Sequence, residues 1–124
     1  MSGGREDFVA IAGTVQTYVE GMAGADETKL RAAFHPKASI IGYFGGEFEW
    51  DSLDEFIEAV KSVVDTPDPN PEWTLQSVDI VGDTAVARAR TAVAGMTFTD
   101  TLSLLRVEGT WVIVAKTYFQ RADG

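Results

Sequence analysis

The first half of the chain contains three stretches in which apolar residues recur every three or four positions, the spacing of one helix face. The first stretch predicts an amphipathic helix over residues 6–23. Asp26 can cap a short second helix that includes Phe34 and that Pro36 ends. Ser52 and Glu55 have the spacing of a capping box, which predicts the start of a third helix. The apolar face of that helix would consist of Leu53, Phe56, Ile57, Val60, Val63 and Val64.

Strands are predicted where apolar and polar residues alternate, or where short apolar runs lie between turn residues. A strand over residues 38–44, the Gly45-Gly46 turn and a short strand from Glu47 to Trp50 precede the third helix. After a proline-rich loop the apolar residues no longer recur at helical spacing but alternate with polar ones. The expected strands there are residues 73–81, 84–94, 97–106 and 110–119. Helices followed by a meander indicate one α+β domain over residues 1–124, with about three helices packed on a strongly curved antiparallel sheet.

The last predicted hairpin, TFTDTLSLLRVEGTWVIVAKTYF, carries one charge inside each of its alternating strands, Asp100 and Lys116. A three-residue turn with a left-handed glycine would pair Arg106 with Thr110, and therefore Asp100 with Lys116. Residues directly opposite each other share a face of the sheet. A two-residue turn would instead pair Asp100 with Thr117 and place the two charges on different faces.

The expected register divides the hairpin into two faces. One face would carry Phe98, Asp100, Leu102, Leu104, Val112, Val114, Lys116 and Tyr118. The other would carry Thr101, Ser103, Leu105, Trp111, Ile113, Ala115, Thr117 and Phe119. Both faces are largely apolar, but the helices can cover only one of them. We therefore expect the other face to be buried in a two-fold homodimer.

The strand TAVARARTAV alternates small residues with large ones. Its small side consists of Ala85, Ala87, Ala89 and Thr91. These side chains would leave room beneath the helices, and such room is the usual place for a small ligand. Arg88 and Arg90 point the opposite way. There we expect salt bridges at the surface or the dimer interface, with a clamp for an anionic ligand as the alternative.

Composition and charge narrow the range of partners. The 124 residues carry a net charge of −9, whereas nucleic acid and anionic membranes require a positive surface. There are no cysteines, which excludes disulfides and thiolate chemistry. Charges and glycines interrupt every apolar run near the N-terminus, so no signal peptide or membrane span is expected. The prediction is a cytoplasmic protein that binds neither nucleic acid nor membrane.

Several segments resemble the nuclear transport factor 2-like superfamily: YVEGMAGADETKLRAAFHPKASI, the capped third helix and TDTLSLLRVEGTWVIVAKTYF. Within that superfamily the chain is most similar to a branch of small bacterial proteins described as “putative lumazine-binding”. Members of the branch share Phe-His-Pro near the start and Thr-Asp-x-Leu-x-Leu, Gly-x-Trp and Lys near the end. The resemblance extends from about Phe8 to Phe119. It implies a cone-shaped α+β barrel, a pocket between helices and sheet, a dimer and a ligand related to flavin precursors.

The superfamily also includes ketosteroid isomerases, which use a helix tyrosine, a strand carboxylate as base and a protonated aspartate. Tyr18 matches the tyrosine by position, and Asp100 matches the protonated aspartate. The position of the base falls on Gly42, which has no side chain to transfer a proton. The resemblance therefore does not carry the isomerase mechanism over to this chain.

Asp100 and Lys116 are the first candidates for polar groups in a pocket. Asp100 could be kept neutral by burial or be ionised against Lys116, and its alternative role is a structural pair within the sheet. Lys116 could bind an anionic or carbonyl ligand, or extend its ammonium out of the barrel mouth. Tyr18 is either a pocket residue or a core residue with a hydrated hydroxyl. The predicted ligand-binding set consists of Tyr18, Phe34, Phe44, Trp50, Phe56, Phe98, Asp100, Lys116 and Tyr118.

Three further features have structural interpretations beside functional ones. His35 is the single histidine, so no metal site is expected; it should bind the last helical carbonyls, with a general acid–base role as the alternative. The acids between Glu47 and Glu58 are interpreted as a solvated face that also caps a helix. Aromatic residues near the two-glycine turn either stack on a planar ligand or pack in the core, and alternation favours Phe44 over Tyr43 as the pocket residue.

These observations predict a small-molecule-binding protein with a mainly apolar pocket and no cofactor. The first alternative is an isomerase, dehydratase or cyclase that acts on a small hydrophobic carbonyl compound. Its polar groups would be Asp100, Lys116, Tyr18 and, as a proton donor, His35. The second alternative is a dimeric interaction or assembly domain. Its function would lie on the face of Trp111, Ile113 and Phe119.

Overall fold

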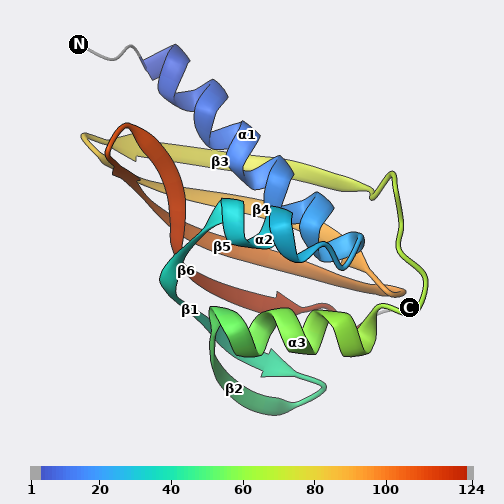
Figure 1. Ribbon diagram of the computed structural model, residues 1–124. Coiled ribbons are helices and arrows are strands. Elements are labelled where there is room, and N and C mark those ends of the chain that lie inside the picture. Colours follow the sequence, from blue (N-terminus) through green and yellow to red (C-terminus); the bar gives the residue numbers. More distant parts are fainter. Residues whose placement is uncertain (1–3, 123–124) are drawn as a thin grey trace.

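The computed structural model describes residues 4–122 and has three helices on one side of a six-stranded, curved sheet that does not close into a barrel (Figure 1). The helices are α1 (Gly4–Ala23), α2 (Glu27–Ala33) and α3 (Leu53–Val63). The strands are β1 (Phe34–Phe44), β2 (Glu47–Ser52), β3 (Trp73–Val81), β4 (Thr84–Val93), β5 (Met96–Val107) and β6 (Thr110–Gln120). This architecture confirms the predicted α+β class. In the described part of the chain, no helix is long and apolar enough to span a membrane.

The strands are ordered β2-β1-β6-β5-β4-β3 across the sheet. Neighbours are antiparallel as expected, except that β1 and β6 run parallel. Helix α1 crosses β3 and β4, whereas α3 lies along the end of the sheet formed by β1 and β2 (Figure 1). The helices therefore cover one face of the sheet, and α3 covers the part of it nearest to the β1–β2 edge.

Both predicted helix caps are present. The Asp26 carboxylate accepts a hydrogen bond of 3.2 Å from the backbone N–H of Lys29 at the start of α2. At the start of α3, the Ser52 hydroxyl accepts from the Glu55 N–H (3.2 Å), and the Glu55 carboxylate accepts from the Ser52 N–H (2.8 Å). Phe34 is the first residue of β1 and not part of the second helix, because its backbone is already extended.

The turn between β5 and β6 has two residues and not three. In Glu108-Gly109 both residues have positive φ (50° and 85°), which is the conformation of a two-residue hairpin turn. Val107 consequently pairs with Thr110. The predicted pairing of Asp100 with Lys116 is therefore wrong.

A bulge in β6 reverses the effect of this shorter turn on which side chains share a face of the sheet. Leu104 pairs with Ile113, whereas Ser103 pairs with Ala115, so the register shifts by one residue between them. Val114 is the extra residue that has no partner on β5. Because side chains alternate between the faces of a strand, the inserted residue exchanges the two faces of β6 from that point onward.

The exchange brings the two charged residues to one face by a different route from the predicted one. Asp100 is opposite Tyr118, and it is therefore a diagonal neighbour of Lys116 on the inner face. In the part of β6 before the bulge, the side chains lie on the faces opposite to those predicted. Trp111 and Ile113 are 3% and 0% exposed and lie in the core, not on the outer face.

The small side of β4 lies against α1 and not beneath an open space. Its residues are buried: Ala85, Ala87, Ala89 and Thr91. Helix α1 contacts β4, and the small side chains allow it to pack closely on the sheet. None of the four lines the cavity described below, so the predicted position of the pocket above the middle of β4 is wrong. Only Val93, at the end of this strand, reaches that cavity.

Candidate functional site

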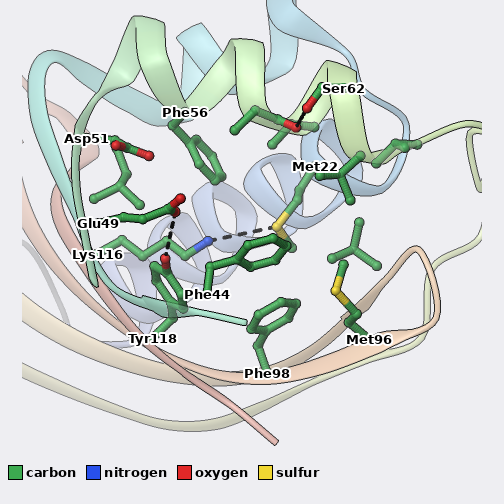
Figure 2. A pocket seen from close by; sticks show the side chains of 16 residues that line it. Met22, Phe44, Glu49, Asp51, Phe56, Ser62, Met96, Phe98, Lys116 and Tyr118 are labelled. Carbon is green, nitrogen blue, oxygen red and sulfur yellow. Dashed lines mark hydrogen bonds between the residues drawn. The ribbon is translucent and has the colours of Figure 1, made fainter. Parts of the chain in front are cut away.

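A cavity of about 210 Å³ lies between α3 and the inner face of the sheet (Figure 2). Its apolar lining consists of Met22, Ile40, Phe44, Phe56, Ala59, Val60, Val63, Val64, Val93, Met96 and Phe98. Its polar lining consists of Glu49, Asp51, Ser62, Lys116 and Tyr118. Mainly apolar walls with a few polar groups are typical of a site for a small organic molecule.

Lys116 extends from β6 into this interior and is only 4% exposed. Its Nζ atom lies 4.9 Å from the ring centre of Tyr18, 4.5 Å from that of Phe56 and 5.2 Å from that of Tyr118. The Nζ atom points toward the sulfur of Met22, 3.9 Å away (Figure 2). Within residues 4–122, Lys116 forms no ion pair and no hydrogen bond to an oxygen atom.

Burial lowers the pKa of Lys116 from the ordinary lysine value of 10.5. The negative charge of Asp100 raises the pKa and so acts in the opposite direction. The three aromatic rings also favour the charged form, because each stabilises an ammonium by about 0.5–2 kcal/mol. These contributions do not replace the water around the charge, whose loss costs several kcal/mol, and the N–H donors face no oxygen acceptor of the described chain. Lys116 therefore has a larger fraction of neutral amine than a lysine in water.

Asp100 lies behind the cavity wall in a small cluster of hydroxyl groups. Its Oδ2 atom accepts hydrogen bonds from the hydroxyls of Tyr18 (2.6 Å) and Thr91 (3.2 Å), whereas Oδ1 has no hydrogen-bond partner among residues 4–122. Burial, together with the adjacent Asp100, raises the pKa of Tyr18, so that its hydroxyl stays a donor. Asp100 and Tyr18 are both 0% exposed and do not line the cavity. Their polar groups therefore bind each other behind the wall of the cavity.

Tyr118 reaches from β6 to a carboxylate on β2. Its hydroxyl donates a hydrogen bond of 3.3 Å to Oε1 of Glu49 (Figure 2). Burial and the nearby Glu49 raise the pKa of Tyr118. Gly42 pairs with Glu49 on one side and with Tyr118 on the other, and a Cβ atom at Gly42 would lie 2.7 Å from the Tyr118 ring. The ring of Tyr118 thus occupies the space that a side chain at position 42 would need.

Glu49 and Asp51 give the cavity two carboxylates. Both come from β2 and lie on one side of the cavity, with Met96 and Phe98 on the other (Figure 2). Burial, with the nearby charge of Glu55, raises the pKa of Asp51. In a chain with a net charge of −9, two carboxylates beside the cavity disfavour an anionic ligand.

The structure places the predicted ligand-binding residues in three different environments. The cavity is lined by Phe44, Phe56, Phe98, Lys116 and Tyr118. Tyr18, Phe34 and Asp100 lie in the core behind it, and Trp50 is 65% exposed and does not line it. His35 does not line the cavity either, and its Nδ1 atom accepts a hydrogen bond from the Lys37 N–H (3.0 Å) in place of the expected helix carbonyl contact. A role in ligand binding stays a prediction for all of them.

The two carboxylates were not predicted from the sequence, because the polarity of β2 is reversed. Phe48 and Trp50 are exposed, at 58% and 65%, whereas Glu49 and Asp51 face the cavity. Hydrophobicity alone predicts the opposite orientation. The informative signal is the turn, because a two-residue glycine turn pairs Gly42 with Glu49, and residues opposite each other share a face.

The fold and the cavity between helices and curved sheet define a protein of the nuclear transport factor 2-like class. A protein of this class and of unknown function from Silicibacter pomeroyi DSS-3 is 37% identical, with a TM-score of 0.90 over 97% of this chain and 100% of that chain. Another from Shewanella baltica OS155 is 30% identical, with a TM-score of 0.90 over 99% and 100%. A ketosteroid isomerase-like protein from Erwinia carotovora atroseptica, 18% identical, shares the fold, with a TM-score of 0.76 over 95% and 98%.

The chain belongs to the family described as “Putative lumazine-binding”, whose model matches residues 6–119. This match confirms the resemblance inferred from the sequence motifs. The chain is also similar to the protein named “Aldolase FrzH” from Cladobotryum sp., with 26% identity over 119 residues, which is 90% of each chain.

Replacement of Gly42 by alanine tests the contact between β1 and Tyr118. The new Cβ atom would lie 2.7 Å from the ring, so Tyr118 must move away from Glu49. We expect G42A to lower the free energy of unfolding by about 1–3 kcal/mol, the usual cost of overpacking, in urea denaturation. Gly13 is the matched control, since a Cβ there meets no atom within 4 Å in α1. G13A should raise stability by about 0.5–1 kcal/mol, and an equal gain in G42A would contradict the close contact.

Replacement of Lys116 by methionine tests the effect of burial on its pKa. Because the pKa is lowered in the folded state, the unfolded chain binds the proton more tightly, and stability rises with pH up to the unfolded value of 10.5. Urea denaturation between about pH 7 and about pH 9.5 should therefore show wild type gaining stability relative to K116M as pH increases. The control K61M removes an exposed lysine whose pKa is raised by Glu27, so its difference from wild type should stay flat in this range. A flat difference for K116M as well would show that burial does not shift the Lys116 pKa.

Proposed function

We propose that the cavity binds a small, mainly apolar organic molecule, with a polar group of that molecule at Lys116. The observation that carries this proposal is the buried amine of Lys116 on the wall of a largely apolar cavity. An unpaired cationic group inside a protein lowers its stability, and an apolar residue of similar size would remove that cost. Groups that are retained at such a cost, inside a cavity, are typical of functional sites.

The size of the cavity limits the ligand. A cavity of about 210 Å³ is far larger than one water molecule needs and lies below the range of about 300–1,000 Å³ that is typical of sites for drug-sized ligands. This volume suits a molecule with one or two rings. The aromatic rings of Phe44 and Phe98 are stacked, with ring centres 6.3 Å apart and an angle of 12° between the ring planes. Both rings line the cavity. Flat hydrophobic faces of this kind favour a planar or cyclic ligand.

Lumazine is one candidate because of the family to which the chain belongs. Its two-ring size is compatible with the cavity, but its many nitrogen and oxygen atoms require several hydrogen-bonding partners. The polar lining residues that could supply them are Glu49, Asp51, Ser62, Lys116 and Tyr118. A less polar ligand with a single carbonyl group matches the mostly apolar lining better.

An enzyme acting on a small carbonyl compound is the second candidate function. Of the polar groups expected for such an isomerase, dehydratase or cyclase, only Lys116 lines the cavity. Asp100 and Tyr18 bind each other behind it, and His35 does not line it. The relative from Cladobotryum is named an aldolase, and aldol reactions act on carbonyl compounds. Lys116 is thus the residue on which an enzymatic function would depend.

Ligand binding can be tested by filling the cavity from α3. Ala59 lines the cavity, so A59F should occupy part of its volume and weaken binding of lumazine and of benzyl alcohol at least about tenfold in calorimetric titration. Glu58 is exposed on the same helix and does not line the cavity, so E58F should bind as wild type does. Mass spectrometry of small molecules released from the purified protein should show a compound in wild type that is absent from A59F. Failure of wild type to bind either probe or to release any compound would count against the proposal.

We also propose that the outer face of the sheet pairs two copies of this chain. Tyr43, Phe48 and Phe119 are 62%, 58% and 66% exposed on this face, and the rings of Tyr43 and Phe48 are in contact, with centres 5.5 Å apart. Tyr43 follows Gly42, the partner of Tyr118, so it lies beside Phe119 across β1 and β6. Large exposed apolar patches are typical of interfaces between proteins. This patch replaces the predicted one, because Trp111 and Ile113 are in the core.

A charge within this patch should separate the two copies. We expect wild type to sediment as a dimer, and F119E to sediment as a monomer, because a carboxylate cannot be buried between apolar faces without a partner. Val9 provides the control, since it is also exposed (61%) but belongs to α1 on the other side of the sheet. V9E should remain dimeric. A monomeric wild type at micromolar concentration would exclude this assembly.

A further inference from the structure

The surroundings of Lys116 differ from those of every other lysine in the chain. The other three are Lys29, Lys37 and Lys61. All three are exposed, and Lys29 and Lys61 form ion pairs with Glu20 and Glu27, respectively. Lys116 is buried, has no carboxylate within ion-pair distance in the described chain, and lines the cavity. Among the four lysines, Lys116 is therefore the one whose amine is shielded from water and also lies beside the cavity.

We propose that Lys116 forms an imine with a small apolar aldehyde or ketone that binds in the cavity. This inference rests on the proposed function, because it requires a ligand in that cavity. It adds the chemical class of the ligand and assigns Lys116 the part of a covalent nucleophile, in place of a simple hydrogen-bond donor. A lysine whose amine is removed from water in an apolar pocket is activated for this reaction.

The charges around the cavity favour a neutral carbonyl compound over an anion. If Lys116 served to bind an anionic ligand, the surrounding groups should not repel negative charge. Glu49 and Asp51, however, line the same cavity, and Asp100 lies behind it. An uncharged aldehyde or ketone avoids this repulsion, and its hydrocarbon part fits the apolar wall.

The reaction balances without any further reactant. The lone pair of Nζ attacks the carbonyl carbon, the C–N bond forms, and the carbonyl oxygen takes up a proton to give a carbinolamine. Loss of water then breaks the C–O bond and forms the C=N bond, so both amine hydrogens leave with the oxygen. Protonation of the imine nitrogen restores a positive charge at the position of the ammonium.

The groups around Nζ suit this iminium ion. The rings of Tyr18, Phe56 and Tyr118 lie 4.5–5.2 Å from Nζ and attract a cation at that position. Unlike an ammonium, an iminium ion has only one N–H donor, so fewer donors are left without an acceptor in this apolar environment. The iminium also makes the neighbouring C–H bonds of the ligand more acidic, and the Glu49 carboxylate on the same cavity wall is a base that could accept such a proton.

Reductive trapping with benzaldehyde tests the proposal on the intact protein. Sodium cyanoborohydride reduces an imine to a stable secondary amine, which adds the mass of benzaldehyde less one oxygen atom to the modified lysine. Peptide mass spectrometry should show Lys116 modified at least about tenfold faster than Lys29, Lys37 or Lys61, which serve as exposed controls in the same molecule. An excess of benzyl alcohol, which has the same ring but no carbonyl group, should slow the modification of Lys116 and leave that of the exposed lysines unchanged.

Variants at Lys116 and at an exposed position of α3 test this assignment. K116M should lose the modification at this position, whereas E58F, whose position does not line the cavity, should keep both the modification of Lys116 and the binding of benzyl alcohol. K116R retains the positive charge and is the second variant if K116M does not fold. Modification of Lys116 no faster than that of the exposed lysines, in a protein that binds benzyl alcohol, would overturn the imine and leave the proposed function standing. Absence of both benzyl alcohol binding and Lys116 modification would overturn the proposed function as well.

Discussion

The extra residue Val114 in β6 is the constraint on which the cavity depends. With a two-residue turn and no bulge, Lys116 and Tyr118 would point to the outer face, and the cavity would lose its cation and its tyrosine hydroxyl. The bulge exchanges the faces after Ile113, so one strand supplies a core residue before it and cavity residues after it. A single inserted residue thus lets β6 contribute both to the hydrophobic core under α1 and to the cavity under α3.

The hydrogen bonds of Asp100 explain why Lys116 is left without an ionic partner. Asp100 is a diagonal neighbour of Lys116, and a direct ion pair between them would be the ordinary solution for two buried charges. The hydroxyls of Tyr18 and Thr91 bind one carboxylate oxygen, and these bonds hold Asp100 behind the wall. Asp100 then influences Lys116 through its charge alone. The hydroxyls of Tyr18 and Thr91 therefore stabilise the buried carboxylate of Asp100, and the amine of Lys116 stays available to the cavity.

Much of the fold could be predicted from the sequence, because it depends on local patterns. The helix face of residues 6–23, the capping box at Ser52 and the meander after Trp73 each need only periodicity and turn residues. Less of the candidate site could be predicted from the sequence. The shared face of Asp100 and Lys116 was predicted through a wrong turn, which the bulge compensated. No local pattern signals a bulge, whereas the inward orientation of Glu49 and Asp51 follows from strand pairing across the two-residue glycine turn and is the opposite of what the hydrophobicity of β2 predicts.

Gly42 connects the resemblance to ketosteroid isomerases with the chemistry available here. Without a side chain at this position, the ring of Tyr118 lies across β1 and its hydroxyl reaches Glu49 on the next strand. A carboxylate is thus present beside the cavity, but it comes from β2 and is bound to a tyrosine. The Tyr18 and Asp100 pair is closed off by burial and by its own hydrogen bond. The amine of Lys116 is buried and has no hydrogen bond to oxygen in the described chain, so the proposed imine would use this amine and not a pair of acids.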